Sequence, residues 1–317
     1  MSNPRKHHYV PQFYLSGFTA EQGSSRLYVL DKEAQRSYPS CINDAACERD
    51  FYIVEVEDEG DPFAVEKFFS TIEASGAEAL RFVMEHRSVP EGELYRKFIA
   101  FLAVMTIRGP GVIDMIEKPF AQVIKSMLWY ATSSKEAFEK FIADGNPEGK
   151  AQVEGMTFEE ARDFLRSDKY TVSMGQNFKL SLLFTMLEPA EPLLAARNWS
   201  VVAAGDGAPD FICSDRPSTL CWTMPTPGPF GPALGLPNTT AMFPLSRRLA
   251  LLGLFEKVTV PPHLNAKAVG VINMYTAMYA KRFVYSGSDD FTVTLADGSA
   301  GDRAGFLTTV KPAPAQE

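Results

Sequence analysis

The chain is poor in cysteine, with four in 317 residues. Small secreted scaffolds that rely on disulfides carry a much denser set, so that class is excluded. The thiols of Cys41 and Cys47 are separated by five residues and those of Cys213 and Cys221 by seven. Zinc knuckles use a spacing of about two to four residues, which does not match. We therefore expect four free thiols in a reducing compartment.

Long apolar runs are also missing from the sequence. A membrane-spanning helix needs roughly 18 or more consecutive apolar residues, and no such uncharged stretch occurs. The residues that precede His8 lack the apolar segment of a secretory signal peptide. We therefore expect a soluble, cytoplasmic protein with no membrane partner.

Positive charge is in deficit, because 31 Lys and Arg stand against 39 Asp and Glu, for a formal net charge of −8. Proteins that hold nucleic acid through its phosphates usually present a basic face. No long basic run occurs here, so extensive nonspecific nucleic-acid binding is not expected. Hydrophobic residues make up 45% of the chain and include 23 Phe, enough for a sizeable folded core.

Several well-defined catalytic and nucleotide-binding motifs are absent. The chain has no G-x-x-x-x-G-K-[ST] phosphate loop and no G-x-G-x-x-G after a strand. It has no G-x-S-x-G nucleophile elbow and no H-E-x-x-H zinc motif. The candidates for chemistry are therefore polar residues scattered along the chain.

The order of strand-like and helix-like segments predicts an α+β fold. Residues 26–38 have the pattern of a hairpin, and residues 51–56 that of a further strand. Residues 63–197 show apolar side chains at helical spacing almost throughout. Strand patterns then return, followed by a last strong helix over about 265–283. We expect N-terminal and C-terminal strands to form a sheet region, with a large helical block inserted between them.

No repeat or clean linker divides the chain. We expect a single α+β domain over residues 1–305 and a disordered tail over residues 306–317. Pro189 and Pro192 are expected to kink or end the last helix of the helical block. Seven prolines between residues 209 and 237 predict a long irregular loop there.

The opening segment is the most distinctive of the chain: His7-His8-Tyr9-Val10-Pro11-Gln12-Phe13-Tyr14-Leu15. Pro11 suits the first position of a short helix. The segment resembles the start of an uncharacterised bacterial family, the domain-of-unknown-function family numbered 4238. Later segments agree with that family in order: residues 50–52, Glu66, 72–73, 106–110, 211–217, 243–246 and 271–273. The resemblance spans residues 5–285 and implies family membership, without implying an activity.

The pair His7 and His8 supplies half of the histidines in the chain. A neutral imidazole can bind a metal or transfer a proton near neutral pH. Adjacent side chains do not easily point the same way, so one ring is expected to face inward. We favour His8, which borders the rigid segment that ends at Pro11. The alternative for His8 is a structural role, as a helix cap or in a core hydrogen bond.

Two carboxylates, Glu66 and Glu73, lie seven residues apart in the first predicted long helix. Seven residues make about two turns, so both fall on nearly the same side, beside the apolar stripe. A half-buried carboxylate needs a cation, a metal or a histidine. The alternative is an ordinary solvated or salt-bridged helix edge. The family resemblance favours Glu73 over Glu66.

Three further polar residues are candidates. Arg108 ends an apolar helix and either complements the helix dipole or holds a carboxylate or phosphate in a two-pronged grip. Asp215 follows an apolar strand, where an aspartate serves either as a metal ligand or base or as a turn residue. Asn273 lies on an apolar helix face, where a core hydrogen bond is the favoured role.

Two functions follow from these residues. The first is a metal-assisted hydrolase of phosphate esters or phosphodiesters, a class that includes nucleases. In it His8, Glu73 and Asp215 bind a divalent ion, and Arg108 holds the anionic substrate. This hypothesis requires His8 and Glu73 to lie within about 12 Å of each other, because metal ligands lie about 2 Å from the ion. The second is a non-catalytic ligand- or partner-binding protein, such as a defence-system component.

Overall fold

The computed structural model describes residues 5–21, 23–56, 60–145, 155–224 and 231–309. The chain separates into two compact units. Unit 1 comprises residues 1–111 and 180–317, and unit 2 comprises residues 112–179. The single domain expected over residues 1–305 stays a prediction.

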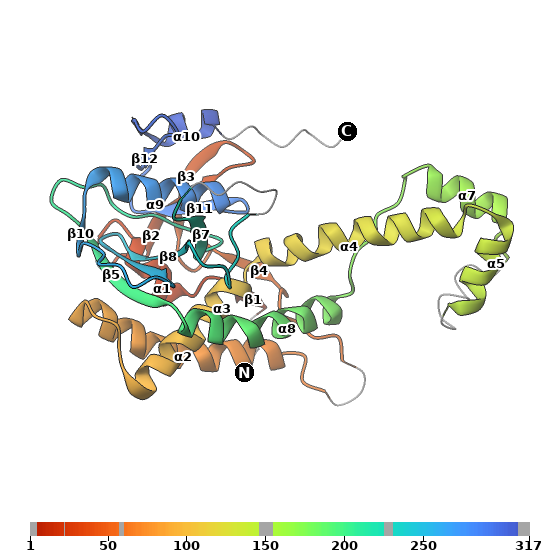
Figure 1. Ribbon diagram of the computed structural model, residues 1–317, viewed down its shortest axis with the longest axis horizontal. Coiled ribbons are helices and arrows are strands. Elements are labelled where there is room, and N and C mark those ends of the chain that lie inside the picture. Colours follow the sequence, from red (N-terminus) through yellow and green to blue (C-terminus); the bar gives the residue numbers. More distant parts are fainter. Residues whose placement is uncertain (1–4, 22, 57–59, 146–154, 225–230, 310–317) are drawn as a thin grey trace. The chain divides into compact units, whose positions relative to one another are not determined.

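The α+β architecture is confirmed, with strands first, a helical block in the middle and further strands after it (Figure 1). The N-terminal part contains β1 (Lys6–His8), α1 (Gln12–Leu15), the 3-10 helix η1 (Ser16–Phe18), β2 (Arg26–Asp31), β3 (Arg36–Cys41) and β4 (Cys47–Arg49). The helical block contains α2 (Ala64–His86), α3 (Gly92–Ile107), α4 (Pro110–Ala131), α5 (Lys135–Asp144), α7 (Phe158–Arg166) and α8 (Gln176–Ala195). The C-terminal part contains β5 (Asn198–Ala204), β6 (Cys213–Ser214), β7 (Thr219–Trp222), β8 (Thr239–Ser246), β9 (Leu249–Leu254), β10 (His263–Leu264), α9 (Ala266–Tyr279), β11 (Phe283–Ser286), β12 (Val293–Thr294), β13 (Ala300–Gly301) and α10 (Arg303–Thr309).

The largest sheet of unit 1 has the strand order β10-β5-β9-β8-β7. Its neighbours are antiparallel except for the parallel pair β10–β5. β8 and β9 form the hairpin at its centre, and both are buried along most of their length. Their apolar side chains on both faces explain why the two strands lie inside the sheet.

The second sheet of unit 1 has the order β3-β2-β11-β6 and joins the two ends of the chain. The predicted hairpin over residues 26–38 is confirmed as β2 and β3. β11 pairs with β2 on one side and with β6 on the other. Residues that are far apart in sequence therefore meet in this sheet.

Helix α9 contributes to two apolar clusters. Val269 and Ile272 belong to one, and Ala277 belongs to the other together with Ala280, the residue that follows the helix. Asn265 caps α9, because its side chain accepts a hydrogen bond from the backbone N–H of Ala268 at 2.9 Å. α9 is buried on the side that carries these residues, whereas Val271 and Met278 are exposed.

Helices α1, α2 and α3 pack around Phe101 of α3. Gly76 of α2 lies against the Phe101 ring so closely that a Cβ there would overlap it. The rings of Phe13 and Tyr14 in α1 lie 5.7 and 6.4 Å from the same ring, between centroids. The opening segment is thereby fixed on the helical block.

Two local predictions near the N-terminus are wrong. No strand forms over residues 51–56, because Asp50 has a left-handed φ of 59° and accepts a bond from the Ile53 N–H at 3.1 Å. The strand of this region is β4, which pairs with β1. Pro11 is the cap residue before α1 and not its first helical residue.

The structure locates the ends of two predicted helices. Of the two outcomes expected at Pro189 and Pro192, a kink or a helix end, the end is excluded, because α8 contains both and continues to Ala195. α9 ends at Tyr279, earlier than the expected 283, and a further short helix, α10, follows. Residues 306–309 of the expected tail belong to α10, whereas residues 310–317 lie outside the described residues.

Unit 2 is helical throughout its regular structure. Most of α4, all of α5 and α7, and the start of α8 belong to it. Ser134 caps α5, and Thr157 and Glu160 form a reciprocal capping box on α7. Among the described residues no single helix is long and apolar enough to cross a membrane. The pair α3 and α4 reaches that length and hydropathy only when the two helices are taken together, and a bend of 50° lies between them.

All four cysteines are free thiols, as predicted.

Candidate functional site

A cavity of about 720 Å³ opens in unit 1 beside the opening segment. Three parts of the chain form its walls: β1 with α1, the loop after β3, and the first half of α2. Its polar lining consists of Lys6, His8, Gln12, Asn43, Asp44, Glu66 and Glu73. Three of the predicted site residues, His8, Glu66 and Glu73, therefore share one cavity.

Arg108 lies behind this cavity and is 1% exposed. Its guanidinium donates to the carboxylate of Glu73 and to the backbone carbonyl of His8. It also stands over the rings of Tyr52 and Phe69, at 5.8 and 5.3 Å from their centroids. One guanidinium thus ties the chain at His8 to α2, which keeps His8 and Glu73 close together.

The two carboxylates of α2 have different surroundings. Glu73 is the ion-pair partner of Arg108. The Oε2 atom of Glu66 is buried and has no hydrogen-bond partner among the described residues. Burial raises the pKa of Glu66 to about 7; the charge of Arg108 opposes this rise and that of Glu73 adds to it. Glu66 is therefore close to half-protonated at neutral pH.

His8 is half-buried at the edge of the cavity. Its Nε2 lies 3.4 Å from Nε2 of Gln12, and its ring also bonds the backbone of Asn43. Burial lowers the pKa of His8 below its ordinary value of 6.5, although the Asn43 bond and Glu73 oppose this shift. The ring is thus neutral at pH 7, and its unprotonated nitrogen is Nε2, which faces the donating amide N–H2 of Gln12 at the long distance of 3.4 Å.

His7 points the other way and is fully buried. Its Nδ1 accepts a hydrogen bond from the backbone N–H of Tyr52 at 2.8 Å, and the two rings are parallel at 5.8 Å. The inward-facing histidine was expected to be His8, and it is His7. The two side chains diverge because β1 is extended and successive residues of a strand face opposite sides.

Asp215 does not line the cavity. Its carboxylate accepts hydrogen bonds from the backbone N–H groups of Lys281, Arg282 and Phe283 at 2.7, 2.7 and 2.8 Å. These bonds hold the turn between α9 and β11. Burial raises the pKa of Asp215, and the three N–H donors oppose this rise.

Asn273 also lies away from the cavity, in α9. Its side-chain oxygen accepts from Ile212 N–H at 3.2 Å, and its Nδ2 donates to the carbonyls of Asp210 and Thr292 at 2.8 and 2.9 Å. Its amide is occupied by backbone groups of two neighbouring loops.

These positions bear on the predicted metal site. No group of three His, Cys, Asp or Glu side chains in the described ranges is arranged to hold a metal ion. His8 and Glu73 are close, but both oxygens of Asp215 are already bonded to backbone N–H groups. The donor set His8, Glu73 and Asp215 therefore does not fit a divalent ion.

The loop after β3 forms part of the cavity wall, and the sequence did not predict this. Asn43 and Asp44 line the cavity, and Asp44 forms an ion pair with Lys6. A turn-forming Asn-Asp pair after a hairpin strand is the only signal in the sequence, and it is common in ordinary turns.

The comparison with protein families gives one match. The model of the family described as protein of unknown function (DUF4238) matches residues 6–290, which is most of the chain. The chain belongs to this family. The resemblance carried by the opening segment is thereby confirmed. The DUF4238 match covers the whole cavity and Arg108 and ends before α10. No curated protein and no solved structure matches the chain.

Proposed function

We propose that this DUF4238 protein is a hydrolase that uses His8 as general base and Glu66 as general acid. The observation that supports this proposal is that both side chains line one cavity of about 720 Å³. Their pKa values, below 6.5 for His8 and about 7 for Glu66, suit the two roles near neutral pH. A neutral imidazole can accept a proton while a protonated carboxyl group donates one.

The proposed reaction needs two proton transfers. His8 takes a proton from a water molecule as the water oxygen attacks the substrate, and Glu66 gives its proton to the leaving group as that bond breaks. The products then carry one hydrogen of the water and the proton of Glu66, while the other water hydrogen is on His8. His8 releases that proton to solvent and Glu66 takes one up, which restores the starting state. Arg108 acts as a positioning residue, since it holds the backbone of His8 and the carboxylate of Glu73.

The charges around the cavity favour an uncharged or cationic substrate. Three carboxyl groups line it, those of Asp44, Glu66 and Glu73. The cation that lines it, Lys6, is paired with Asp44, and Arg108 behind it is paired with Glu73. With Glu66 protonated, the other two carboxylates are balanced by these two cations, so a phosphate ester would meet no net positive charge here. A carboxylic ester or amide therefore fits better than the phosphate ester suggested by the sequence.

A second candidate is a protein that binds a ligand without turning it over. The pairs Arg108–Glu73 and Lys6–Asp44 engage most charged groups of the cavity within the chain, as in a structural network. Glu66 and the amides of Gln12 and Asn43 would then hold a polar ligand by hydrogen bonds.

A panel of chromogenic carboxylic esters, amides and phosphate esters, assayed with and without a chelator, tests the proposal. We expect hydrolysis of an uncharged ester or amide that the chelator does not change. The rate should fall as the pH drops through the pKa of His8, which lies lower than 6.5, and as the pH rises above about 7, where Glu66 loses its proton. His8→Asn and Glu66→Gln should each lower kcat by about 100-fold or more. The control is Glu85→Gln, which changes an exposed glutamate of the same helix.

Three results would contradict the proposal. Phosphate-ester hydrolysis that the chelator abolishes would support the metal-assisted reaction. Full activity of both the His8 and the Glu66 variant would show that neither side chain takes part in the reaction. No turnover, together with a ligand-induced rise in melting temperature that Glu66→Gln abolishes, would support the binding protein.

A further inference from the structure

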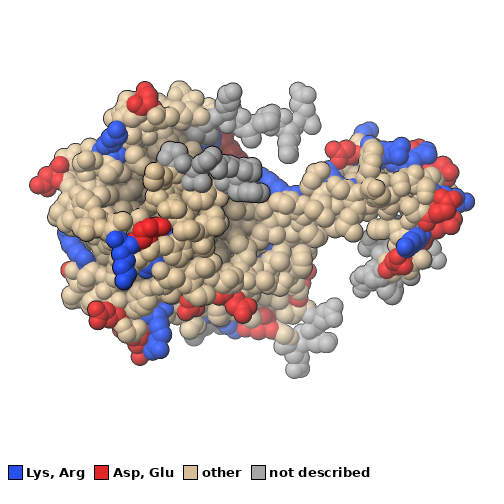
Figure 2. All heavy atoms as spheres, viewed as in Figure 1, with Lys and Arg blue, Asp and Glu red and all other residues tan. Residues whose placement is uncertain are grey.

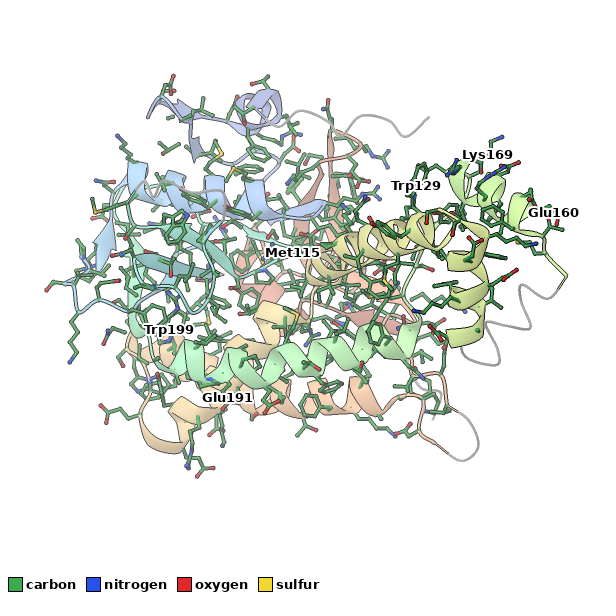
Figure 3. The ribbon with its side chains drawn as sticks, turned by 45° about the vertical axis from the view of Figure 1, so that its right-hand side comes forward. Met115, Trp129, Glu160, Lys169, Glu191 and Trp199 are labelled. Carbon is green, nitrogen blue, oxygen red and sulfur yellow. The ribbon has the colours of Figure 1, made fainter. Side chains whose placement is uncertain are left out.

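Helix α4 presents an apolar face to solvent over most of its length. Its large hydrophobic side chains that are more than half exposed are Met115 (57%), Val123 (57%), Met127 (54%), Trp129 (55%) and Tyr130 (79%). Met115 lies near the start of α4 and Trp129 near its end (Figure 3). A helix face in water normally carries polar and charged residues, so this face is the opposite of the usual pattern.

The spacing of these residues makes the face continuous. Val123 follows Met115 by eight residues, and Met127 and Tyr130 follow at further steps of four and three, which is helical spacing. The exposed Pro119 fills the gap between the first two. We call the surface formed by Met115, Pro119, Val123, Met127, Trp129 and Tyr130 the α4 apolar face.

Charge is nearly absent from the α4 apolar face. Of the exposed residues of α4, Lys118 alone is charged. Within unit 2, charged side chains gather over α5 and α7, whereas the visible surface of α4 is mostly uncharged (Figure 2). An exposed apolar patch without charges is typical of a protein–protein interface.

Contacts within unit 2 hold one flank of α4 and reach the edge of the α4 apolar face at Trp129, whose ring lies against Arg166. Lys125 of α4 forms an ion pair with Asp168 at 2.5 Å, and the guanidinium of Arg166 stands 5.0 Å from the centre of the Trp129 ring. The α4 apolar face is therefore presented by a helix that α7 already supports. A pre-formed surface loses little entropy on binding.

We propose that the α4 apolar face binds the same face of a second copy of this chain. Large apolar side chains offer up to about 150–250 Å² each, so the exposed parts of the five sum to roughly 600 Å². A stable interface covers about 800 Å² per partner, which this area nearly reaches before neighbouring atoms are included. Because Lys118 is the one charged residue among the exposed residues of α4, two copies meet with little of the repulsion that separates two like-charged surfaces.

A two-fold axis then determines which residues meet. In a symmetric dimer each copy uses the same patch. We place the two-fold axis perpendicular to α4, which makes the two helices an antiparallel pair. With the axis between Gln122 and Val123, Met115 of one chain faces the partner's Tyr130. Val123 lies next to the axis and close to its own copy.

Sedimentation of the full chain at several concentrations tests this proposal. We expect a reversible dimer with twice the chain mass of 35.0 kDa. Val123→Asp should raise the dimer dissociation constant at least about tenfold, because two carboxylates would be buried near the axis. Thr171→Asp, which adds the same charge at an exposed site of unit 2 outside α4, should leave the constant unchanged.

A cross-link tests the register separately. Under mild oxidation Val123→Cys should give a covalent dimer, whereas the wild type and Thr171→Cys should not. The proposal is overturned by a monomer at every concentration, by equal effects of the two aspartate variants, or by flotation with phosphatidylcholine–phosphatidylserine vesicles without self-association. The last result would assign the α4 apolar face to a lipid surface.

Discussion

Two carboxylates of unit 1, Asp215 and Glu66, are buried in different ways. Asp215 accepts three backbone N–H groups, one on Oδ1 and two on Oδ2. Glu66 has a buried Oε2 with no partner in the part of the chain that the structure describes, and it lines a cavity. Buried polar atoms are normally satisfied, so a satisfied carboxylate is best explained by structure and an unsatisfied one beside a cavity by function.

Two other buried polar side chains, Asn273 and Arg108, differ in the same way: one has all its partners within the described part of the chain and the other does not. The amide of Asn273 makes three hydrogen bonds to backbone groups around α9. The guanidinium of Arg108 is fully buried, yet its Nε has no acceptor among the described residues. The region around α9 is thus saturated with internal bonds, whereas the cavity region retains polar atoms that can bind something else.

The largest effect is expected from Asp215→Ala. The change leaves three buried backbone N–H groups without an acceptor, and we expect a loss of about 4 kcal/mol in the free energy of unfolding. Urea denaturation measures it, with the exposed Asp206→Ala as the control. Molecules that remain folded should keep their hydrolytic activity. Unchanged stability with lost activity would mean that Asp215 acts in the hydrolysis. The distinction between a structural Asp215 and a functional Glu66 would then be wrong.

Removal of Arg108 is the next largest change. Arg108→Met leaves the Glu73 carboxylate without its cation, and we expect a loss of about 3 kcal/mol. The double variant Arg108→Met, Glu73→Gln should recover part of that loss, because the stranded charge is gone. A double-mutant cycle in urea measures this coupling. Strictly additive losses would show that the pair does not act as a unit.

A smaller loss is expected from Asn273→Leu. The side chains have similar size, so the main cost is the unpaired N–H of Ile212 and the two abandoned carbonyls. We expect about 2 kcal/mol in urea denaturation. Val271→Ala, at a partly exposed position of the same helix, is the control. Equal small effects would mean that the bonds around α9 add little stability.

Much of the fold could be predicted from local patterns. The hairpin of β2 and β3, the strands β8 and β9, and the helical block all follow from the periodicity of apolar residues. The wrong predictions fall on segments whose conformation depends on contacts with residues distant in sequence. Residues 51–56 have strand composition, but the Tyr52 N–H bonds His7 and the Tyr52 hydroxyl bonds the carbonyl of Arg108. Helix α8 continues through two prolines that local preference places at a helix end.

The candidate site was only partly predictable, for a related reason. The helical spacing of Glu66 and Glu73 does place both beside the cavity. Nothing in the sequence distinguishes them from Asp215, because the partners of Asp215 lie 66 to 68 residues away. The ion-pair partner of Glu73 is also distant in sequence, 35 residues away. Whether a buried polar group has a hydrogen-bond partner depends on residues that are distant in sequence, and not on the residues next to it in the chain.

The smallest expected effect is the pH dependence of stability that Glu66 causes, and it tests whether Glu66 differs from Asp215. Its pKa rises from an ordinary value of 4.5 to about 7 in the folded chain. The folded state therefore holds the proton more tightly than the unfolded state, so stability falls as the pH rises from 4.5 through 7. Glu66→Gln cannot ionise and should not show this fall.

Thermal unfolding at pH 5 and pH 8 measures that difference. The melting temperature of Glu66→Gln should match the wild type at pH 5 and exceed it by about 2 °C at pH 8, a small shift because solvent screens a half-exposed group. Glu85→Gln, on an exposed position of the same helix, should change neither value. A wild-type advantage at pH 8 would mean that Glu66 is stabilised as a charged group. Glu66 would then resemble Asp215, as a structural carboxylate without a proton to give at neutral pH.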